Sequence, residues 1–285
     1  MTANILDGIV LGLQFGLLAA GLTLIYGLGG VLNLAYGQMA VVAAITVSLA
    51  MDAGLPVIPA VGVGLLVGGV FGLLLDATLL RPVYRRRGEA RVLLSLLLTL
   101  GVSFIVDGYL NWRYPLKALN LYIGGGAIEI LGVPMRRGSL VASAITLVTI
   151  TSLFVFLRYT SLGRAIRSVI ENEDGARLIG IDPKKMLRLI LVLSGILAAL
   201  VALTRSMIAP VDTTSGLSMT VFALIVTVVG GLGNVVGALL AGIILGIVNV
   251  VAADLIGSYI SLIILLGAAA VTLLIRPAGL LGVKE

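Results

Sequence analysis

The sequence predicts an all-α integral membrane protein, a polytopic helical bundle of about eight or nine transmembrane helices. Apolar side chains make up 60% of the 285 residues and charged ones only 11%, and the mean hydropathy is +1.20. Charged residues are about a quarter of an ordinary soluble domain. Residues 8–51 and 213–253 contain no Asp, Glu, Lys or Arg, whereas one helical span needs only about twenty apolar residues. These features exclude a soluble fold.

Apolar runs separated by charges and turn signals place nine expected spans along the chain. They lie near residues 5–26, 31–50, 56–80, 92–111, 139–158, 187–209, 216–232, 235–252 and 256–275. If one Gly-interrupted segment is re-entrant, the count becomes eight and the N-terminus moves from the outer to the inner side. The first residues lack the basic region of a cleavable signal peptide, so the first apolar run is expected to be retained. We expect residues 1–285 to form a single transmembrane domain.

Charge asymmetry orients the expected helices. The loop 81–91 carries five arginines and one glutamate, and the loop 158–188 carries seven basic and four acidic residues. The positive-inside rule therefore places both loops in the cytoplasm. The loop 111–138 between them then faces outward, where its aromatic and Gly-rich composition would suit a docking surface, and the C-terminus is cytoplasmic.

The composition also removes several kinds of chemistry. The sequence has no Cys and no His, which excludes disulfides, thiol catalysis and thiolate or imidazole metal sites. No metal site and no catalytic residue is predicted. The net charge of +6 comes from loops that flank spans, where basic residues set topology. We therefore do not expect the chain to bind nucleic acid.

Small residues recur at every fourth position in three stretches. In lipid, such a stripe lets two helix backbones approach closely, so we interpret all three as packing seams rather than ligand sites. The three sets are Gly8, Gly12 and Gly16; Gly64, Gly68 and Gly72; and Gly233, Gly237 and Ala241, with Gly242 and Gly246 nearby.

Two apolar runs are interrupted by glycines and end in asparagine, at residues 27–33 and 230–234. Paired interrupted helices are a sequence indicator of a solute site near the bilayer midplane. The alternative is a pair of ordinary turns between helices on the cytoplasmic side.

Polar side chains within or at the edges of spans are costly and are candidates for a translocation path. Asp76 and Asp107 lie near expected span ends, where interfacial snorkelling or a local ion pair, such as Asp76 with Arg81, would explain them. The candidates for the path itself are Gln14, Thr23, Tyr26, Asn33, Tyr36, Gln38, Asn234 and Asn249.

The charged loop 158–188 predicts two helices. The first begins near Ser161 and runs to about Leu178, with Gly180 ending it in a left-handed conformation. Asp182 and Pro183 then supply an N-cap and a first helical residue for the next span. The first helix is amphipathic and either docks onto a partner or lies on lipid headgroups. Its acidic cluster 171–174 favours a protein partner, because an anionic leaflet would repel it.

Residues 158–204 resemble the cytoplasmic loop and following span of the permease subunits of branched-chain amino acid ABC importers. Segments 33–38, 81–82, 229–237 and 276–282 match the same family in the same order. This resemblance implies a coupling helix that docks onto an ATPase subunit. Carried over to this sequence, that helix consists of Glu171, Asn172, Glu173, Asp174, Gly175, Ala176, Arg177, Leu178, Gly180 and Ile181.

The resemblance also implies partners and a location. The chain would be a permease subunit of a bacterial or archaeal plasma membrane, paired with a second homologous permease or a copy of itself. Two ATP-binding subunits and an extracytoplasmic substrate-binding protein would complete the importer. The chain lacks a phosphate-binding G-x-x-x-x-G-K-[ST] motif, so it needs no cofactor of its own and the partner subunits would use ATP.

Branched-chain or similar small amino acids are the substrates that the resemblance implies. Tyr36 and Gln38 stand where relatives commonly have His and Glu, which leaves urea, amides or aromatic acids as alternatives. Two other classes are an ion-coupled secondary transporter and a membrane scaffold that transports nothing. An ion-coupled carrier usually needs an acidic residue deep in the bundle, whereas the carboxylates here cluster at span edges.

Overall fold

The computed structural model describes residues 2–84, 86, 88–124, 126–130, 132–276 and 279–281. Parts of the expected basic loop (Arg85 and Arg87), the Gly-rich outer loop (Gly125) and the C-terminal motif (277, 278 and 282–285) lie outside these residues. The apolar helices of the described chain are α1 (Thr2–Gly29), α2 (Tyr36–Asp52), α3 (Val57–Leu75), α5 (Glu89–Arg113), α6 (Arg137–Tyr159), α9 (Pro183–Ser206), α10 (Ser215–Gly230), α11 (Val235–Ile256) and α12 (Ser258–Ile275).

The all-helical polytopic class is confirmed, and every expected apolar run forms a helix. Seven of the described helices are long and apolar enough to cross a membrane. The other two, α2 and α10, have 17 and 16 residues. They are shorter because the segments before them, residues 30–35 and 207–214, are mostly not helical. The expected span 31–50 therefore begins late, at Tyr36.

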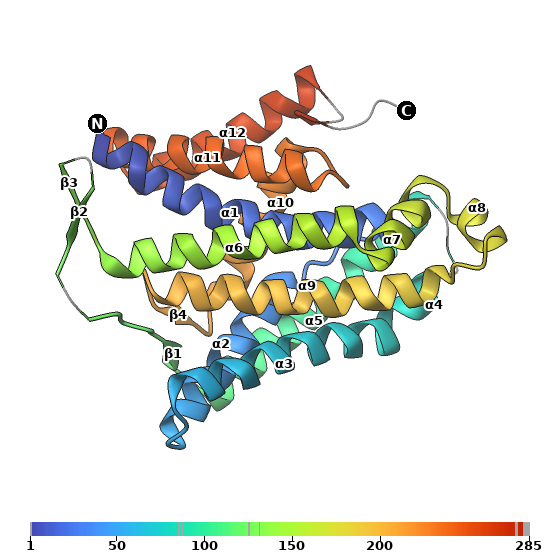
Figure 1. Cartoon of the computed structure of the whole chain (residues 1–285), viewed down its shortest axis with the longest axis horizontal. Coiled ribbons are helices and arrows are strands. Elements are labelled where there is room, and N and C mark those ends of the chain that lie inside the picture. Colours follow the sequence, from blue (N-terminus) through green and yellow to red (C-terminus); the bar gives the residue numbers. More distant parts are fainter. Residues whose placement is uncertain are drawn as a thin grey trace.

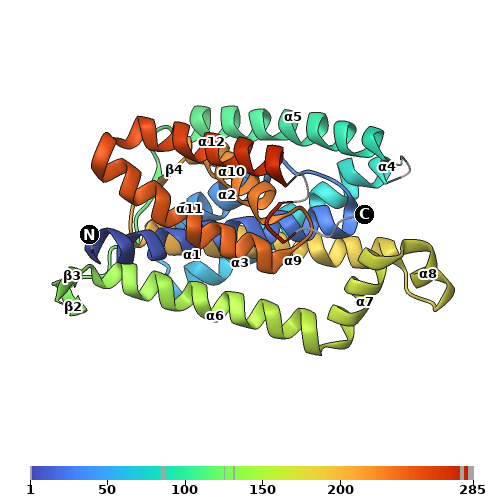
Figure 2. The ribbon, with the colours of Figure 1, turned by 90° about the horizontal axis from the view of Figure 1, so that it is seen from above.

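Short elements lie at the two ends of the bundle (Figure 1). One end carries two antiparallel pairs, β1 (Ala118–Leu119) with β4 (Val211–Asp212), and β2 (Ile128–Ile130) with β3 (Val133–Met135). The opposite end carries the π-helix η1 (Asp76–Leu80), α4 (Arg81–Val83), α7 (Ser161–Glu171) and α8 (Glu173–Leu178). Figure 2 shows α7 and α8 at the far end of the molecule from the N-terminus.

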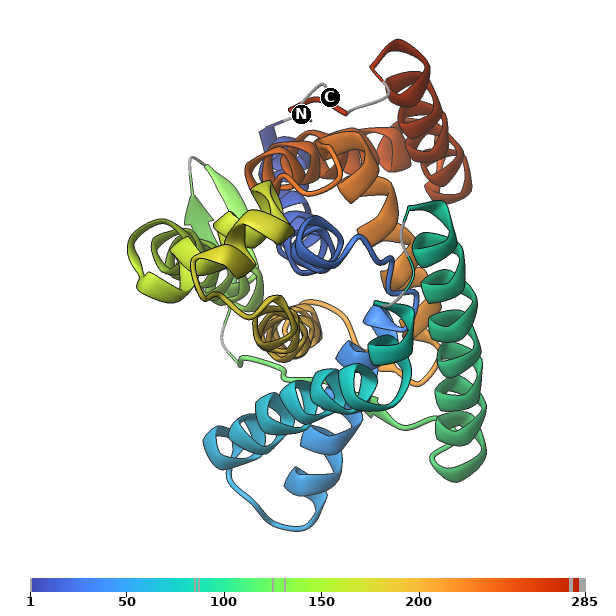
Figure 3. The same cartoon turned by 90° about the vertical axis from the view of Figure 1, so that its right-hand side faces the viewer.

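Two helices form the centre of the bundle. Over its most apolar window α1 is 83% buried and α9 is 61% buried, whereas α5, α6 and α12 are each only 17% buried. Viewed along the bundle, α1 (blue) and α9 (gold) lie inside a ring formed by the other helices (Figure 3). The outer helices therefore have most of their surface free for lipid or for neighbouring subunits.

The small-residue stripes pack helices together, as predicted. The stripe of α1 lies against α11, where a Cβ added to Gly12 would be 2.6 Å from the Cα of Ile243. The stripe of α3 lies against α9, where a Cβ added to Gly68 would be 2.5 Å from the carbonyl oxygen of Gly195. Backbones this close leave room only for glycine.

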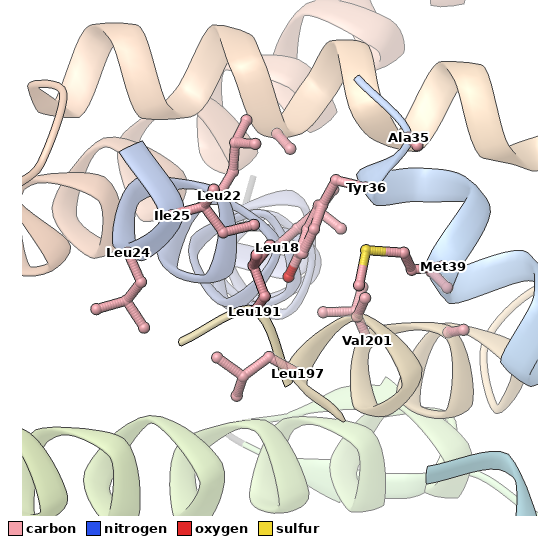
Figure 4. Close-up of a cluster of buried hydrophobic side chains, with 14 of the residues drawn as sticks. Leu18, Leu22, Leu24, Ile25, Ala35, Tyr36, Met39, Leu191, Leu197 and Val201 are labelled. Carbon is pink, nitrogen blue, oxygen red and sulfur yellow. The ribbon is translucent and has the colours of Figure 1, made fainter. Parts of the chain in front are cut away.

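Large apolar side chains fill the space between α1, α2 and α9 (Figure 4). Leu22 and Ile25 of α1 and Tyr36 and Met39 of α2 are buried, as is Leu191 of α9. This cluster holds the short helix α2 against the two central helices, and with it the non-helical segment that precedes α2.

Candidate translocation and coupling sites

The first glycine interruption puts non-helical backbone inside the protein. Gly30 has a φ of 55°, which ends α1, and the chain then runs back into the bundle through residues 31–35. Leu32 N–H donates to Ser95 Oγ (3.2 Å) and Leu34 N–H donates to Thr99 Oγ1 (2.9 Å). Thr99 is ten residues into α5, about 15 Å along its axis, so this backbone lies near mid-depth.

Thr220 of α10 holds the same segment from the other side. Its hydroxyl donates to the carbonyl of Leu34 (3.2 Å) and accepts from Gly37 N–H (2.9 Å). Irregular backbone is tolerated at membrane depth only where protein or water satisfies its polar groups. Here the hydroxyls of α5 and α10 do so.

The second interruption is a turn at the end of α10. Gly231 and Gly233 have φ values of 108° and 88°, and Asn234 caps α11 by accepting from Gly237 N–H (2.9 Å). A Cβ added to Gly27 would lie 3.0 Å from Gly233 Cα, so the two interruptions touch. Only the first of them carries the chain into the interior.

A chain of polar side chains runs beside the start of α2. Gln38 Nε2 donates to Asp107 Oδ1 (3.4 Å), and Asn111 Nδ2 donates to Asp107 Oδ2 (3.2 Å). Thr213 Oγ1 in turn donates to Asn111 Oδ1 (2.7 Å). Asp107 is thus held by amides rather than by an ion pair with a described residue. This network joins α2, α5 and the linker before α10.

Asp212 stabilises that linker. Its Oδ1 accepts hydrogen bonds from Thr214 N–H (3.0 Å), Thr214 Oγ1 (2.9 Å) and Ser215 Oγ (2.7 Å). Burial raises the pKa of Asp212, but these hydrogen bonds outweigh burial and hold the pKa below its ordinary value. The linker therefore keeps a charged carboxylate, bonded through Oδ1, beside the polar network.

The remaining path candidates lie in separate places. Thr23 is buried and donates to Thr227 (3.3 Å). Tyr26 lines a cavity of about 520 Å³ with Gly30 and Arg91. Asn249 donates to Ser261 (3.5 Å) on α12.

The structure therefore brings only three of the candidates together. Asn33, Tyr36 and Gln38 lie on one short stretch of the chain, and all three are buried. Asn234 donates to the carbonyl of Leu281 (2.7 Å) at the end of α10, and Gln14 lines a cavity at the end of the bundle that carries β3.

The charged loop 158–188 begins with an anchored helix. Thr160 caps α7 by accepting from Gly163 N–H (3.0 Å), so the helix starts at Ser161, as expected. Ile166 and Val169 are buried in the main apolar cluster. Because of these contacts α7 is attached firmly to the spans.

The prediction of a single helix from Ser161 to Leu178 is wrong, because the helix is broken at one residue. Asn172 has φ −156° and ψ 104°, which breaks the helix, and its side chain accepts from Gly175 N–H (2.8 Å) to start α8. An asparagine competes with the helix for backbone hydrogen bonds and favours a cap. Gly180, with φ 84°, and the Asp182 cap on Lys184 N–H (3.0 Å) agree with the prediction.

Two large apolar side chains at the end of α8 point away from the protein. Leu178 is 89% exposed and Ile179 is 71% exposed, whereas Ala176 is buried. Glu173 accepts from Arg177 (2.6 Å) within the same helix. This end of the molecule thus presents an apolar pair beside an internally paired set of charges, and exposed apolar groups rimmed by polar residues mark protein or membrane contacts.

A buried carboxylate joins the start of α9 to the end of α3. Asp76 of η1 is 2% exposed, and its Oδ2 lies 3.3 Å from Arg188 Nε and 3.8 Å from Arg81 Nε. The expected pair with Arg81 is present, and Arg188 adds a second partner. Because Arg188 is at the end of the loop 158–188, a displacement of that loop would act on η1 as well as on α9.

We predict that Asp76→Asn lowers the free energy of unfolding by about 1–2 kcal/mol. This is less than the roughly 3–5 kcal/mol for a fully buried pair, because both arginines are about half exposed. Asp52→Asn, which removes the exposed Asp52–Lys117 pair, is the control and should cost under about 1 kcal/mol. Thermal unfolding in detergent measures both, and equal losses would contradict the buried role.

Sequence inspection missed the hydroxyl groups that hold the buried segment. Ser95, Thr99 and Ser103 are all buried on α5, a helix whose other faces are largely exposed. Their spacing of four residues places them on one helix face. That regular spacing was the sequence signal for a polar helix face. It is not specific, because Ser and Thr are common in spans, where their hydroxyls bond carbonyls of their own helix.

Comparison with characterised proteins gives three informative relatives. The permease LivH of the high-affinity branched-chain amino acid transport system of Escherichia coli is 26% identical over 208 residues, which is 68% of this chain and 66% of LivH. BraD of the same kind of system in Pseudomonas aeruginosa is 27% identical over 72% of this chain and 70% of its own length. The fructose import permease FruF of Bifidobacterium longum is 29% identical over 76% of this chain and 59% of its own length.

The match to LivH thus spans just under two thirds of that protein. Among solved structures, PsaBC from Streptococcus pneumoniae in complex with Fab aligns with a TM-score of 0.50 and 14% identity, covering 95% of this chain and 91% of the other. That similarity concerns the fold alone. The sequence pattern of the branched-chain amino acid transport system permease component matches residues 4–276. The chain therefore belongs to this permease family.

Proposed function

We propose that the chain is the membrane subunit of an ATP-driven importer for branched-chain or similar small amino acids. The observation that carries the proposal is the family match over residues 4–276. In this proposal residues 1–285 act as one permease domain in a bacterial or archaeal plasma membrane. The end with α7 and α8 faces the cytoplasm, and the end with β2 and β3 faces outward.

The proposed complex contains a second permease, either homologous or identical, two ATP-binding subunits and an extracytoplasmic binding protein. Residues 171–181 form the coupling segment, and the exposed Leu178 and Ile179 are its contact residues. The firm attachment of α7 and the Arg188–Asp76 contact support a transfer of motion from this segment to α9 and η1.

For the passage, we propose that residues 31–38 form the part that changes between the two access states. Asn33 and Gln38 lie here, next to a backbone held by side-chain hydroxyls rather than by helical hydrogen bonds. Such bonds can be exchanged for bonds to a solute or water at small cost. Gln14, Thr23, Tyr26, Tyr36, Asn234 and Asn249 remain candidates for other parts of the path.

A sugar importer is the second candidate, because FruF shares 29% identity over 76% of this chain. It differs from the first in the solute and not in the energy source. An ion-coupled secondary carrier remains the rival from another class.

Reconstitution into liposomes tests the energy source and the solute together. The permease is assembled with candidate ATPase and binding-protein subunits from the same genome, and uptake of L-leucine and D-fructose is measured. We expect leucine uptake that requires internal ATP and stops when the ATPases are omitted. Uptake of fructose alone would favour the sugar importer. Uptake that an ion gradient drives without any ATPase would contradict the proposal.

A further inference from the structure

A polar cavity of about 440 Å³ is lined by residues from α1, β3 and the adjoining ends of α6 and α9. Figure 1 shows β3 and the start of α1 at the same end of the bundle. Small-molecule sites have volumes of roughly 300–1,000 Å³. We call it the outer cavity, and its polar lining consists of Asp7, Gln14, Arg136, Ser139 and Arg205. Two guanidinium groups and one carboxylate thus line the same cavity.

The rest of the lining is apolar. Val10 and Leu11 come from α1, and Ile208 follows the end of α9. Basic, acidic and aliphatic groups are therefore within one small volume. This combination complements a solute that itself carries an anion, a cation and an aliphatic portion.

Gln14 shows that the cavity has unused hydrogen-bonding capacity. Its side chain is 3% exposed, and its Nε2 has no hydrogen-bond partner among the residues that the structure describes. Leaving such a buried donor unbonded costs about 1–3 kcal/mol. A ligand oxygen in the cavity would remove that cost.

The cavity also has a polar continuation towards the interior. Ser143 and Thr146 lie one and two turns beyond Ser139 on α6, and neither hydroxyl has a partner in the described part of the chain. Gln14 and Arg205 line a second, smaller cavity that reaches Phe222 of α10. The outer cavity and the smaller one thus share Gln14 of α1 and Arg205 of α9.

We propose that the outer cavity is a binding site of the permease itself for a small amphiphilic solute with a carboxylate and an ammonium group. Arg205 and Arg136 bind the carboxylate, Gln14 donates to it, Asp7 binds the ammonium group, and the aliphatic wall accepts the side chain. Arginine is well suited to this task because its planar fork binds a carboxylate with two parallel hydrogen bonds. The proposal rests on the proposed function only in taking an amino acid as the solute.

Two adjacent arginines provide a matched pair of variants. Arg136 lines the outer cavity, whereas its neighbour Arg137, also exposed, does not. Arg136→Gln and Arg137→Gln therefore remove the same charge at nearly the same place. Arg205→Gln removes the deeper guanidinium, and Arg205→Lys keeps the charge but loses the fork.

Binding is measured with the full chain in lipid nanodiscs, without ATP, using radiolabelled L-leucine with L-leucinol and D-fructose as competitors. We expect leucine to compete, and leucinol, which lacks the carboxylate, and fructose to fail. Arg205→Gln should weaken leucine binding by about tenfold or more, the effect of losing a charge-assisted hydrogen bond. Arg136→Gln should weaken leucine binding less than Arg205→Gln does. Arg205→Lys should give an affinity between those of the wild type and Arg205→Gln, and Arg137→Gln should leave the affinity unchanged.

Several results would overturn the site. They are the absence of leucine binding to the wild type, equal competition by leucinol, or equal affinities of the Arg136→Gln and Arg137→Gln variants. If Arg205→Gln fails to fold, the comparison of Arg136→Gln with Arg137→Gln still tests the outer cavity. Both residues are exposed, so neither substitution should prevent folding. ATP-driven leucine uptake with unaltered binding in these variants would reject the outer cavity while leaving the proposed function intact.

Discussion

A permease with Leu178→Asp and Ile179→Asp is expected to reach the membrane intact and yet lose ATP-driven uptake. The two side chains are 89% and 71% exposed, so they contribute little to the stability of the chain. In a docked complex they would be buried, and full burial of a Leu or Ile side chain contributes about 1.5–3 kcal/mol. Replacing both with carboxylates should therefore lower uptake at least about tenfold and abolish co-purification of the ATPase.

The control for this variant lies at the opposite end of the molecule. Leu116 and Tyr122, in the loop 111–138, are 98% and 80% exposed, and changing both to Asp should leave ATPase co-purification unchanged. Wild-type uptake by the Leu178 and Ile179 variant would reject the coupling role. ATPase binding that persists while only membrane affinity falls would show that α8 lies on the headgroups.

Gly12→Leu is expected to prevent folding of the bundle. A Cβ at this position would already lie 2.6 Å from Ile243 Cα and 2.8 Å from the carbonyl oxygen of Gly242. Overpacking against mobile side chains costs roughly 1–3 kcal/mol, but backbone atoms cannot move aside without separating α1 from α11. We expect the loss of folding free energy to exceed that range. Fluorescence-detected size-exclusion chromatography would then show no monodisperse peak.

Two further substitutions test how the loss of stability depends on the size and place of the added side chain. Gly12→Ala adds only the Cβ and should lower the melting temperature without abolishing the peak. Gly101→Leu, on the exposed face of α5, meets nothing within 4 Å and should leave the melting temperature unchanged or raised. A Gly12→Leu protein as stable as the Gly101→Leu protein would mean that α1 and α11 are not in close contact.

The sequence was sufficient to predict features that depend on local patterns. Each of the nine apolar runs contains a helix in the described chain, because a helix satisfies its own backbone polar groups in lipid, but α2 and α10 are shorter than the other seven. The stripes of glycine predicted close helix packing but not which helices pair, and Gly180 and Asp182 predicted the end and restart of helices in the loop 158–188. These signals act within one or two turns, so a single chain reveals them.

The features that were missed depend on residues distant in sequence. The break at Asn172 was overlooked although Asn172, followed by Glu173 and Asp174, is a helix N-cap pattern, because the helical pattern continues on both sides of it. The pairing of Asp76 with Arg188 joins residues 112 positions apart. The outer cavity combines side chains from α1, α6 and α9, and no periodicity within one helix predicts such a combination.

The buried segment 31–35 has a consequence for how the protein is made. Leu32 and Leu34 find partners on α5, 63 and 65 residues later, and the carbonyl of Leu34 is satisfied by Thr220, 186 residues later. A helix closes its own hydrogen bonds as it leaves the ribosome, but this segment cannot do so. The hydrogen bonds of the segment between α1 and α2 therefore cannot all form until α10 has been synthesised. For most of translation, α2 has to stay near water or the insertion machinery.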